Sequence, residues 1–598
     1  MSLDILPYDE EEVTEKPFDL RLMVRLMAYL KPYWRWILLA LGLILVNSAA
    51  LQAVPYLTKI AVDDYILKGD YAGLNQIALI VLALLVLQIA TSYLQSMVTQ
   101  LTGQWAMVDV RHEIFAHLQR LPISFFDRTP IGRLMTRNTN DVDALNELFT
   151  DGIVVVFSDV FTLLAILAYM FTMDVPLATV ACSVVPVMFV VTFYYQGRSL
   201  RAFRRARSRL ARLNAYLQEN ISGMSIVQLF NRERRNARRF DEINDRYLEA
   251  NLESTFYWSY YFPIMEMLSA AAIALAIWVG SGEVLRSEIQ WGVLVAMLQY
   301  IPRFFRPILE ISERYIILQS AMASSERIFE LLDTDIEPSG GDHRVDRADG
   351  ELIFENVWFA YSDEDWVLRD VSFRVNAGEK VAIVGATGSG KTTIISLLCR
   401  FYDIQKGRIL VDGVEIREWD VEALRSRIGV VQQDVFLFSG DIERNIRLGN
   451  SEITSEFVAL SAEAVNAHQF IDQLPDGYQS AVNERGSTFS SGQRQLLSFA
   501  RALAFDPDIL VLDEATASVD TETEMWIQEA EQRLMKDRTS IVIAHRISTI
   551  RNADRIVVLH KGEVREQGNH DELMDHRGIY HRLHELQYIG GSEPASGE

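Results

Sequence analysis

A glycine-rich segment able to hold phosphate groups lies in the second half of the chain. An apolar, strand-like run over 380–384 leads into it, and a helix-like segment follows from Thr393. Small residues let backbone N–H groups wrap a phosphate, and the helix N-terminus adds its dipole. We expect Lys391 to reach the β- and γ-phosphates and the Thr392 hydroxyl to ligate Mg²⁺. This complete P-loop predicts an ATP site, formed by Gly385, Ala386, Thr387, Gly388, Ser389, Gly390, Lys391, Thr392 and Thr393.

Two other strand ends carry groups suited to ATP hydrolysis. The apolar run 509–513 ends in Asp513 and is followed by Glu514, and the run 540–544 is followed by His545. We expect Asp513 to hold Mg²⁺ through water and Glu514 to polarise the attacking water. His545 can donate to the γ-phosphate. Paired acids at a strand end are commonly a solvated turn, but the phosphate loop upstream favours the catalytic interpretation.

Length, charge and cysteine content exclude several classes of protein. The chain has 598 residues, too many for one ordinary domain. Its net charge of −23 argues against a chain-wide nucleic-acid binder, so we expect no nucleic-acid partner. With 2 cysteines it is not a disulfide scaffold, and we expect both Cys182 and Cys399 to be reduced and buried.

The first half carries six apolar stretches long enough to cross a bilayer, at about 20 residues per span. They lie near 36–57, 77–97, 151–172, 175–195, 256–280 and 291–313. The sixth is the weakest, because Arg303, Arg306 and Glu310 interrupt it.

The segments between the spans indicate further helices. Residues 18–30 place Arg21 and Arg25 four positions apart among apolar residues, which predicts an amphipathic interfacial helix. The two long loops, about 98–150 and 196–255, have helix-like patterning, which predicts that the spanning helices continue into the cytosol. We expect a short turn at each tip, at 122–132 and 222–231.

Charge asymmetry orients these spans. The segments before span one and after spans two and four are rich in Lys and Arg, whereas the connections at 173–175 and 281–290 are poor in them. We therefore expect a multi-pass protein of the cytoplasmic membrane with both termini and both long loops in the cytoplasm. The acidic first 19 residues lack an export or organelle-targeting pattern, which favours a bacterial plasma membrane.

The predicted fold is an α-helical membrane domain followed by an α/β P-loop ATPase domain. The membrane domain would have six transmembrane helices with long cytoplasmic extensions. In chain order we predict an acidic cytosolic arm over 1–17, the membrane domain over 18–332, a linker over 333–350, the ATPase domain over 351–590 and a tail over 591–598.

The ordered motifs resemble the nucleotide-binding domain of ABC transporters. With six spans ahead of it, the chain looks like a half-transporter of the exporter class, from about residue 18 to 588. The matching residues are, in order, Tyr361, 385–392, Gln433, Phe-Ser-Ser-Gly-Gln at 489–493, 513–514, 518–520 and His545.

This resemblance implies roles for residues outside the phosphate loop. Tyr361 would stack on adenine, and Gln433 would touch Mg²⁺ together with Thr392 and Asp513, with Gln432 as the neighbouring candidate. Two ATP molecules would lie between two facing subunits, and residues 483–486 would contact the partner's intracellular tips. The signature residues that cap the partner's ATP would be Ser490, Ser491, Gly492 and Gln493, and the D-loop would include Ser518 and Asp520.

The signature departs from the family pattern. The family usually has Leu-Ser-Gly-Gly-Gln, whereas this chain has Phe489 and Ser491 at the first and third positions. If the backbone there needs glycine, Ser491 introduces strain on the order of 1–3 kcal/mol. The other catalytic residues are intact, a combination that resembles one member of the heterodimeric bacterial multidrug exporters.

The resemblance implies ATP and Mg²⁺ as cofactors, a non-identical second half-transporter with a normal signature, membrane lipids as surroundings, and amphiphilic small molecules as substrates. A homodimer that tolerates Ser491 is the alternative. An ATP-gated channel or regulator is a further alternative, against which Glu514 and His545 argue.

Three residues of spans five and six are candidates for a substrate cavity. Glu266 either binds a cationic substrate or pairs with Arg303 or Arg306, and pairing is slightly favoured. The aromatic cluster 256–262, which includes Trp258, either lines a cavity for flat apolar drugs or forms an interfacial belt, and the belt is favoured. The candidates are Glu266, Trp258 and Arg303.

Overall fold

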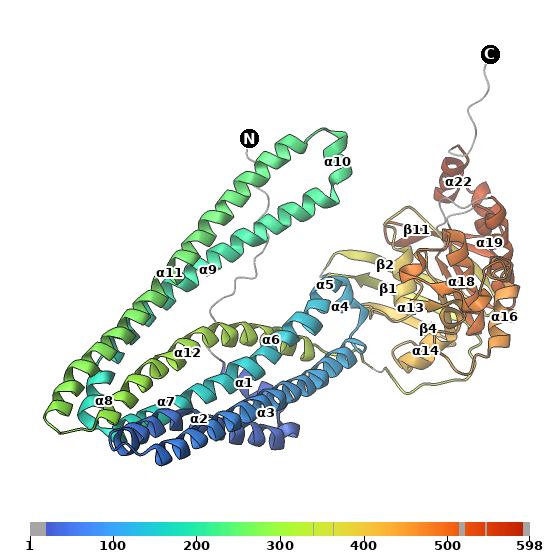
Figure 1. Cartoon of the computed structure of the whole chain (residues 1–598). Helices are drawn as coiled ribbons and strands as arrows, with labels where there is room; N and C mark the ends of the chain where they lie inside the picture. The colour runs from blue at the N-terminus through green and yellow to red at the C-terminus, as the bar shows by residue number, and fades with distance from the viewer. Residues whose placement is uncertain (1–18, 339, 363, 514–520, 545–546, 590–598) are drawn as a thin grey trace. The chain divides into compact units, whose positions relative to one another are not determined.

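The computed structural model describes residues 19–338, 340–362, 364–513, 521–544 and 547–589 (Figure 1). These residues form two compact units. The first unit runs to Arg120 and resumes over Thr129–Asp335, and it is helical. The second unit combines Leu121–Arg128 with the chain from Ile336 onward, and it is α/β. The boundary after Asp335 falls inside the segment predicted as a linker.

The first unit has the predicted membrane-spanning character. Within the described part of the chain, five helical stretches are long and apolar enough to cross a bilayer: Lys31–Ile66, Tyr71–Leu118, Ile131–Met173, Val175–Ser222 and Glu233–Leu285. The sixth predicted span lies in helix α12 (Trp291–Leu332), which is interrupted by the charged residues named above and is not among the five. The helical membrane domain is therefore confirmed, and the sixth span stays a prediction.

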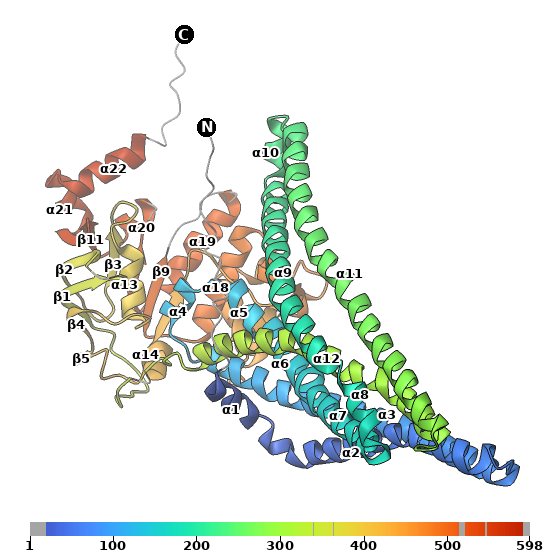
Figure 2. The same cartoon turned by 90° about the vertical axis from the view of Figure 1, so that its left-hand side faces the viewer.

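The spans are built from helices that pack in antiparallel pairs. The helices up to the first tip are α1 (Leu20–Ala28), η1 (Lys31–Tyr33), α2 (Trp34–Ile60), η2 (Ala61–Ile66) and α3 (Tyr71–Leu118). After the tip follow α5 (Ile131–Thr136), η3 (Arg137–Asp141), α6 (Val142–Glu147), η4 (Leu148–Ile153), α7 (Val154–Met173), α8 (Val175–Cys182), α9 (Val185–Ser222), α10 (Met224–Leu229), α11 (Glu233–Leu285) and α12. α2 packs on α3, and α9 packs along α11, as both views show (Figures 1 and 2).

Small residues let the inner helices approach closely. Ala272 and Ala276 of α11 and Ala296 of α12 are fully buried, and they share one core with Tyr300. Such residues are favoured between membrane helices because they bring the backbones together. Of the two cysteines, Cys399 is buried as predicted, whereas Cys182 at the end of α8 is only half-buried.

Both long extensions end at the predicted tips, each in a short helix where a short turn was expected. The first tip contains α4 (Ile123–Arg128), and the second contains α10, which joins α9 to α11 (Figure 2). The second tip exposes apolar side chains: Ile226, Leu229 and Phe230 are 62%, 75% and 66% exposed. Exposed apolar patches of this kind commonly mark interaction surfaces.

The second unit is built on two sheets. A six-stranded sheet has the order β12-β11-β3-β10-β9-β6, and a four-stranded antiparallel sheet has the order β2-β1-β4-β5. The strands are β1 (Leu352–Ala360), β2 (Trp366–Val375), β3 (Lys380–Val384), β4 (Lys406–Val411), β5 (Val414–Glu415), β6 (Ile428–Val431), β9 (Ile509–Asp513), β10 (Thr539–Ile543), β11 (Arg555–His560) and β12 (Glu563–Gly568), with a small pair β7 (Gly440–Asp441) and β8 (Ala481–Val482). Apart from β12, the strands of the larger sheet are parallel.

Helices surround the larger sheet, and α14, α18, α20, α21 and α22 contact its strands. The helices of this part of the chain are α13 (Lys391–Leu398), α14 (Val421–Arg427), α15 (Ile442–Arg447), α16 (Ser455–Ala464), α17 (His468–Ile471), α18 (Ser491–Ala504), α19 (Thr521–Leu534), α20 (Ile547–Arg551), α21 (His570–Asp575) and α22 (Ile579–Ile589). In β3, Val381 and Ile383 enter one hydrophobic core while Ala382 and Val384 enter another. Burial of both faces explains the continuous apolar runs, because a parallel sheet is covered on both sides. The predicted α/β ATPase fold is confirmed.

Candidate nucleotide-binding site

The phosphate loop connects β3 directly to α13. Gly388 and Gly390 have φ angles of +80° and +101°, a left-handed conformation that side chains disfavour. A Cβ added at Gly390 would lie 2.5 Å from Leu368 Cδ2, so this position also has no room for a side chain. The glycines thus allow the tight turn that places the loop at the carboxyl end of β3.

Lys391 opens α13 and lies folded against the loop. Its side chain is 7% exposed, and Nζ donates hydrogen bonds to the carbonyl oxygens of Gly385 at 2.8 Å and Ala386 at 3.2 Å. Burial lowers the pKa of Lys391, while the nearby Asp513 carboxylate acts in the opposite direction. A partly desolvated cation beside backbone N–H groups attracts an anionic ligand strongly.

The loop also holds a buried polar atom that has no partner. Ser389 is 3% exposed, and its Oγ makes no hydrogen bond within the described part of the chain. An unpaired buried hydroxyl costs free energy, so a ligand oxygen at this point would stabilise the loop. The loop residues therefore fit a polyphosphate.

A cavity of about 340 Å³ brings the predicted ATP and Mg²⁺ residues together. Thr387 to Thr393, apart from Ser389, line it together with Gln433 and Asp513. Asp513 ends β9, and Gln433 follows β6 at the same edge of the sheet, since the strands are parallel. Ligands of such sheets bind beyond the carboxyl ends of the strands. The set Thr392, Gln433 and Asp513 offers the oxygen ligands that Mg²⁺ prefers.

Tyr361 lies beside this cavity and does not line it. Its Oη is 3.1 Å from Thr393 Oγ1, and its ring packs edge-on against Tyr402 at 5.0 Å between centroids. Its side chain is 37% exposed, so a face remains accessible. Adenine stacking on Tyr361 stays a prediction.

The signature residues begin α18. Ser490 is its N-cap: Ser490 Oγ accepts from Gln493 N at 3.1 Å, and Gln493 Oε1 accepts from Ser490 N at 3.0 Å. Ser491 is the first residue of the helix, exposed and without a positive φ, so the backbone strain predicted for it is absent. Phe489 is 9% exposed and packs on Phe470, which makes it an anchor of the core. Any effect of Ser491 must therefore come from its hydroxymethyl group.

The cap predicts a stability effect. Ser490→Ala removes the acceptor for Gln493 N, so we expect it to destabilise the second unit by about 1 kcal/mol. Ser490→Thr keeps the oxygen and should lose far less. A thermal melt of the purified full chain, with Ser487→Ala as an exposed control, measures the difference; equal melting temperatures for the alanine and threonine variants at position 490 would refute the cap.

Several predicted catalytic residues lie outside the described residues. These are Glu514, Ser518, Asp520 and His545. Their roles stay predictions, supported by their places after β9 and β10.

The structure adds a contact that sequence reasoning did not identify. Within the second unit, Arg128 Nη2 at the end of α4 donates to the carbonyl oxygen of Tyr361 at 2.8 Å. Tyr402 Oη donates to the carboxylate of Asp127, and burial and this bond raise the pKa of Tyr402. The tip of the first extension thus contacts the tyrosine that is bonded to α13.

The charged residues predicted in the membrane are arranged differently from expectation. The predicted pairing of Glu266 with Arg303 or Arg306 is wrong, and Glu266 is exposed. Arg306 Nε donates to Glu310 at 2.7 Å. Arg303 Nη1 donates to the Leu51 carbonyl oxygen at 2.7 Å. Pro55 explains the last bond, because a proline in a helix has no N–H for the carbonyl four residues earlier. Of Trp258, the structure describes only its place in α11.

Sequence reasoning also missed a carboxylate in the third span. Asp159 of α7 is 7% exposed, and its Oδ2 has no hydrogen-bond partner in the described part of the chain. The same signal that singled out Glu266, an acidic residue inside an apolar run, could have identified Asp159.

Comparisons with known proteins agree with both units. Residues 37–308 match the ABC transporter transmembrane region, and residues 368–517 match the ABC transporter family. An uncharacterised ABC transporter ATP-binding protein of Bacillus subtilis is 40% identical over 97% of both chains. A putative multidrug export ATP-binding/permease protein of Bacillus subtilis is 36% identical over 95% of this chain and 99% of its own length. An ATP-dependent lipid A-core flippase of Syntrophus aciditrophicus is 36% identical over 94% of both.

Three findings indicate the same protein family: a helical unit fused to an ATPase unit, the phosphate cavity, and similarity over the full length of known proteins. The chain belongs to the ABC transporters, as an ATP-hydrolysing, multi-pass half-transporter of the exporter class.

Proposed function

We propose that this chain exports amphiphilic compounds, drug-like or lipid-like, across the cytoplasmic membrane as one half of a dimeric pump. The cavity that joins Lys391, Gln433 and Asp513 supports the proposal, because its lining would suit a phosphate ligand in a chain with membrane helices. Relatives named for multidrug export and for lipid A-core flipping support the substrate class. Since ATP is cytosolic, the ATPase unit and both termini would face the cytoplasm.

A second half-transporter would complete the dimeric transporter. The apolar tip formed by Ile226, Leu229 and Phe230 is exposed, and so are Phe436 and Phe438 of the second unit, at 47% and 56%. Covering such side chains with a partner's complementary surface would be favourable at roughly 25 cal/mol per Å² of apolar area. Each tip would contact the partner's ATPase unit.

The ATP site supports a division of roles. Lys391 and the loop N–H groups would bind the phosphates, and Thr392, Gln433 and Asp513 would hold Mg²⁺, which neutralises charge on the transferring phosphate. Glu514 would polarise the attacking water, and His545 would donate to the γ-phosphate. ATP binding would close the two ATPase units, and hydrolysis would reopen them.

The partner would be non-identical. Ser491 is exposed at the start of α18, where a glycine of the usual signature would leave room for the partner's nucleotide. Because the backbone is unstrained there, the added hydroxymethyl group would weaken capping by occupying space. One ATP site, formed by this phosphate loop and a normal partner signature, would then hydrolyse well, and the other would hydrolyse poorly.

ATP hydrolysis by the chain purified alone in lipid tests this proposal. We expect near-zero activity for the wild-type chain and a gain of about tenfold or more for Ser491→Gly, equivalent to about 1.4 kcal/mol of barrier. Glu514→Gln added to Ser491→Gly should lower the hydrolysis rate by about 10²–10⁴-fold, which removes the gain.

The controls separate the two dimer types. Ser487→Gly, a nearby exposed serine outside α18, should leave activity unchanged. Brisk hydrolysis by the unmodified chain, abolished by Glu514→Gln, would show a homodimeric pump and reject the heterodimer. The export role is tested in inverted vesicles that contain every candidate partner. If ATP is hydrolysed there but no amphiphilic dye accumulates, the export role is rejected.

A further inference from the structure

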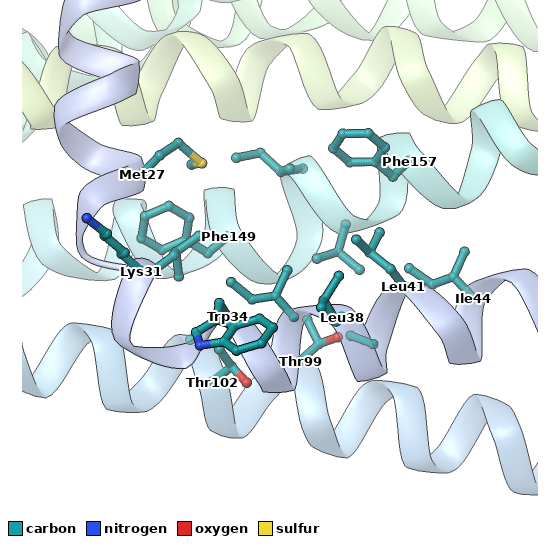
Figure 3. A pocket seen from close by; sticks show the side chains of 16 residues that line it. Met27, Lys31, Trp34, Leu38, Leu41, Ile44, Thr99, Thr102, Phe149 and Phe157 are labelled. Carbon is teal, nitrogen blue, oxygen red and sulfur yellow. The ribbon is translucent and has the colours of Figure 1, made fainter.

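The first unit contains a pocket that no part of the proposed transport cycle uses. Its volume is about 490 Å³, and it lies between α1, α2, α3 and the η4–α7 segment (Figure 3). Lys31 lies at one end, and Ile44 and Phe157 lie at the other. From Trp34 to Ile44, the part of α2 that lines the pocket covers about 15 Å at 1.5 Å per residue. The pocket is therefore long, with an apolar body and one cationic end.

Aromatic residues place the cationic end at the membrane surface. The ring of Trp105 lies 5.8 Å from Tyr33 and 5.6 Å from Trp36, measured between centroids. Tyrosine and tryptophan gather at the level of the lipid headgroups. Lys31 precedes Tyr33 by two residues, so its ammonium group lies at headgroup level. Trp34, which lines the pocket, is 55% exposed, so the pocket opens on a surface that the bilayer would cover.

A buried hydroxyl group in the pocket wall has no partner. Thr99 is 9% exposed, and its Oγ1 makes no hydrogen bond within the described residues, whereas Thr102 Oγ1 donates to the Val98 carbonyl at 2.7 Å. The pocket lining is otherwise almost wholly apolar, so a ligand oxygen is the natural partner. Thr99 lies six residues along α3 from Trp105, about 9 Å deeper at 1.5 Å per residue. That depth suits an ester group just inside the headgroups.

We propose that this pocket binds one acyl chain of an anionic membrane phospholipid as a resident ligand. The lipid phosphate contacts Lys31, an ester carbonyl accepts from Thr99 Oγ1, and the chain runs toward Ile44 and Phe157. Charge complementarity favours an anionic headgroup: Lys31 is the charged residue of the lining, and the exposed Arg35, whose guanidinium lies 5.6 Å from the Trp34 ring, adds a second cation nearby. The lipid is distinct from transported cargo, because its pocket belongs to the surface of α1–α3 and α7.

Photo-crosslinking of the full-length chain tests the site. The probe is phosphatidylglycerol with a diazirine in one acyl chain, added to the detergent-solubilised protein, followed by peptide mapping. We expect labels on residues 34–44 and 149–157. Ala40→Phe, which fills the pocket, should reduce labelling at least about fivefold, while Leu39→Phe, one residue outside the lining, should not.

The headgroup contact has its own variant. Lys31→Gln should raise the half-saturating phosphatidylglycerol concentration about fivefold, because one cation near anionic lipid contributes about 1 kcal/mol to binding. Arg21→Gln on α1 should leave this concentration unchanged. Because Lys31 is exposed, its replacement should leave the fold intact. The Lys31→Gln measurement therefore still tests the proposal if the Ala40→Phe variant fails to fold. Lys391→Ala should label normally, which separates this site from ATP-driven transport.

Three outcomes would overturn the proposal. Labels spread evenly over all lipid-facing helices would show ordinary bilayer contact. Equal labelling by the phosphatidylcholine analogue would remove the preference for an anionic headgroup. A pocket labelled only after the dimer is dissociated would show that a second copy or partner chain covers it.

Discussion

Lys391→Ala should lower the ATP hydrolysis rate of the assembled transporter about 100- to 1,000-fold, the range found when one preorganised donor to a transition state is removed. The side chain is 7% exposed, and Nζ is held within 3.2 Å of two loop carbonyls. The charge is therefore partly desolvated and already close to its ligand. Lys391→Arg should fail almost as completely, because a planar guanidinium cannot occupy the position of a compact ammonium group.

The nucleotide-induced rise in melting temperature provides a second measurement. A ligand that binds only the folded state stabilises it by about 2.7 kcal/mol at 100 times its Kd. This rise should be lost in Lys391→Ala, while the melting temperature without nucleotide stays close to that of the wild type. Lys536→Ala, at an exposed lysine in the turn after α19, is the matched control. Hydrolysis above a tenth of the wild-type rate in Lys391→Ala would contradict the assigned role.

Loss of the α4 contacts should uncouple transport from hydrolysis. We expect the double variant Asp127→Asn, Arg128→Ala to reduce transport about 10- to 100-fold, with ATP hydrolysis within about twofold of the wild type. The two removed bonds, to Tyr402 Oη and to the Tyr361 carbonyl, each involve a charged group and are worth about 1.5–3 kcal/mol. Tyr361 Oη in turn contacts Thr393, so the tip is connected to the helix that begins at the phosphate loop.

A double-mutant cycle distinguishes coupling from general damage. If Asp127 acts through Tyr402, then Tyr402→Phe should cost transport on its own and add little to Asp127→Asn. Arg133→Ala, an exposed arginine just after the tip, controls for charge removal. Parallel loss of hydrolysis and transport, or additive effects in the cycle, would show that the contacts only stabilise the second unit.

The residues alone predicted the chemistry and the class of fold. The phosphate loop could be predicted from the sequence because its function depends on local backbone conformation. It needs glycines at positive φ, followed by a lysine at the start of a helix. The membrane helices are readable because length and apolar composition decide insertion. Gln433 was placed by resemblance to the family, and the structure brings it to the same cavity as Asp513.

Contacts between distant segments required the tertiary structure. Asp127 and Tyr402 are 275 positions apart, and neither neighbourhood signals the other. For the same reason the partner expected for Arg303 was wrong: a proline in α2 frees a carbonyl at Leu51, and the arginine bonds that oxygen instead of Glu266. The condition for strain at Ser491, a backbone that needs glycine, is not met, because the residue begins a helix and has no positive φ. Residue types determine local conformation and chemistry, whereas packing decides which freed donor or acceptor meets which partner.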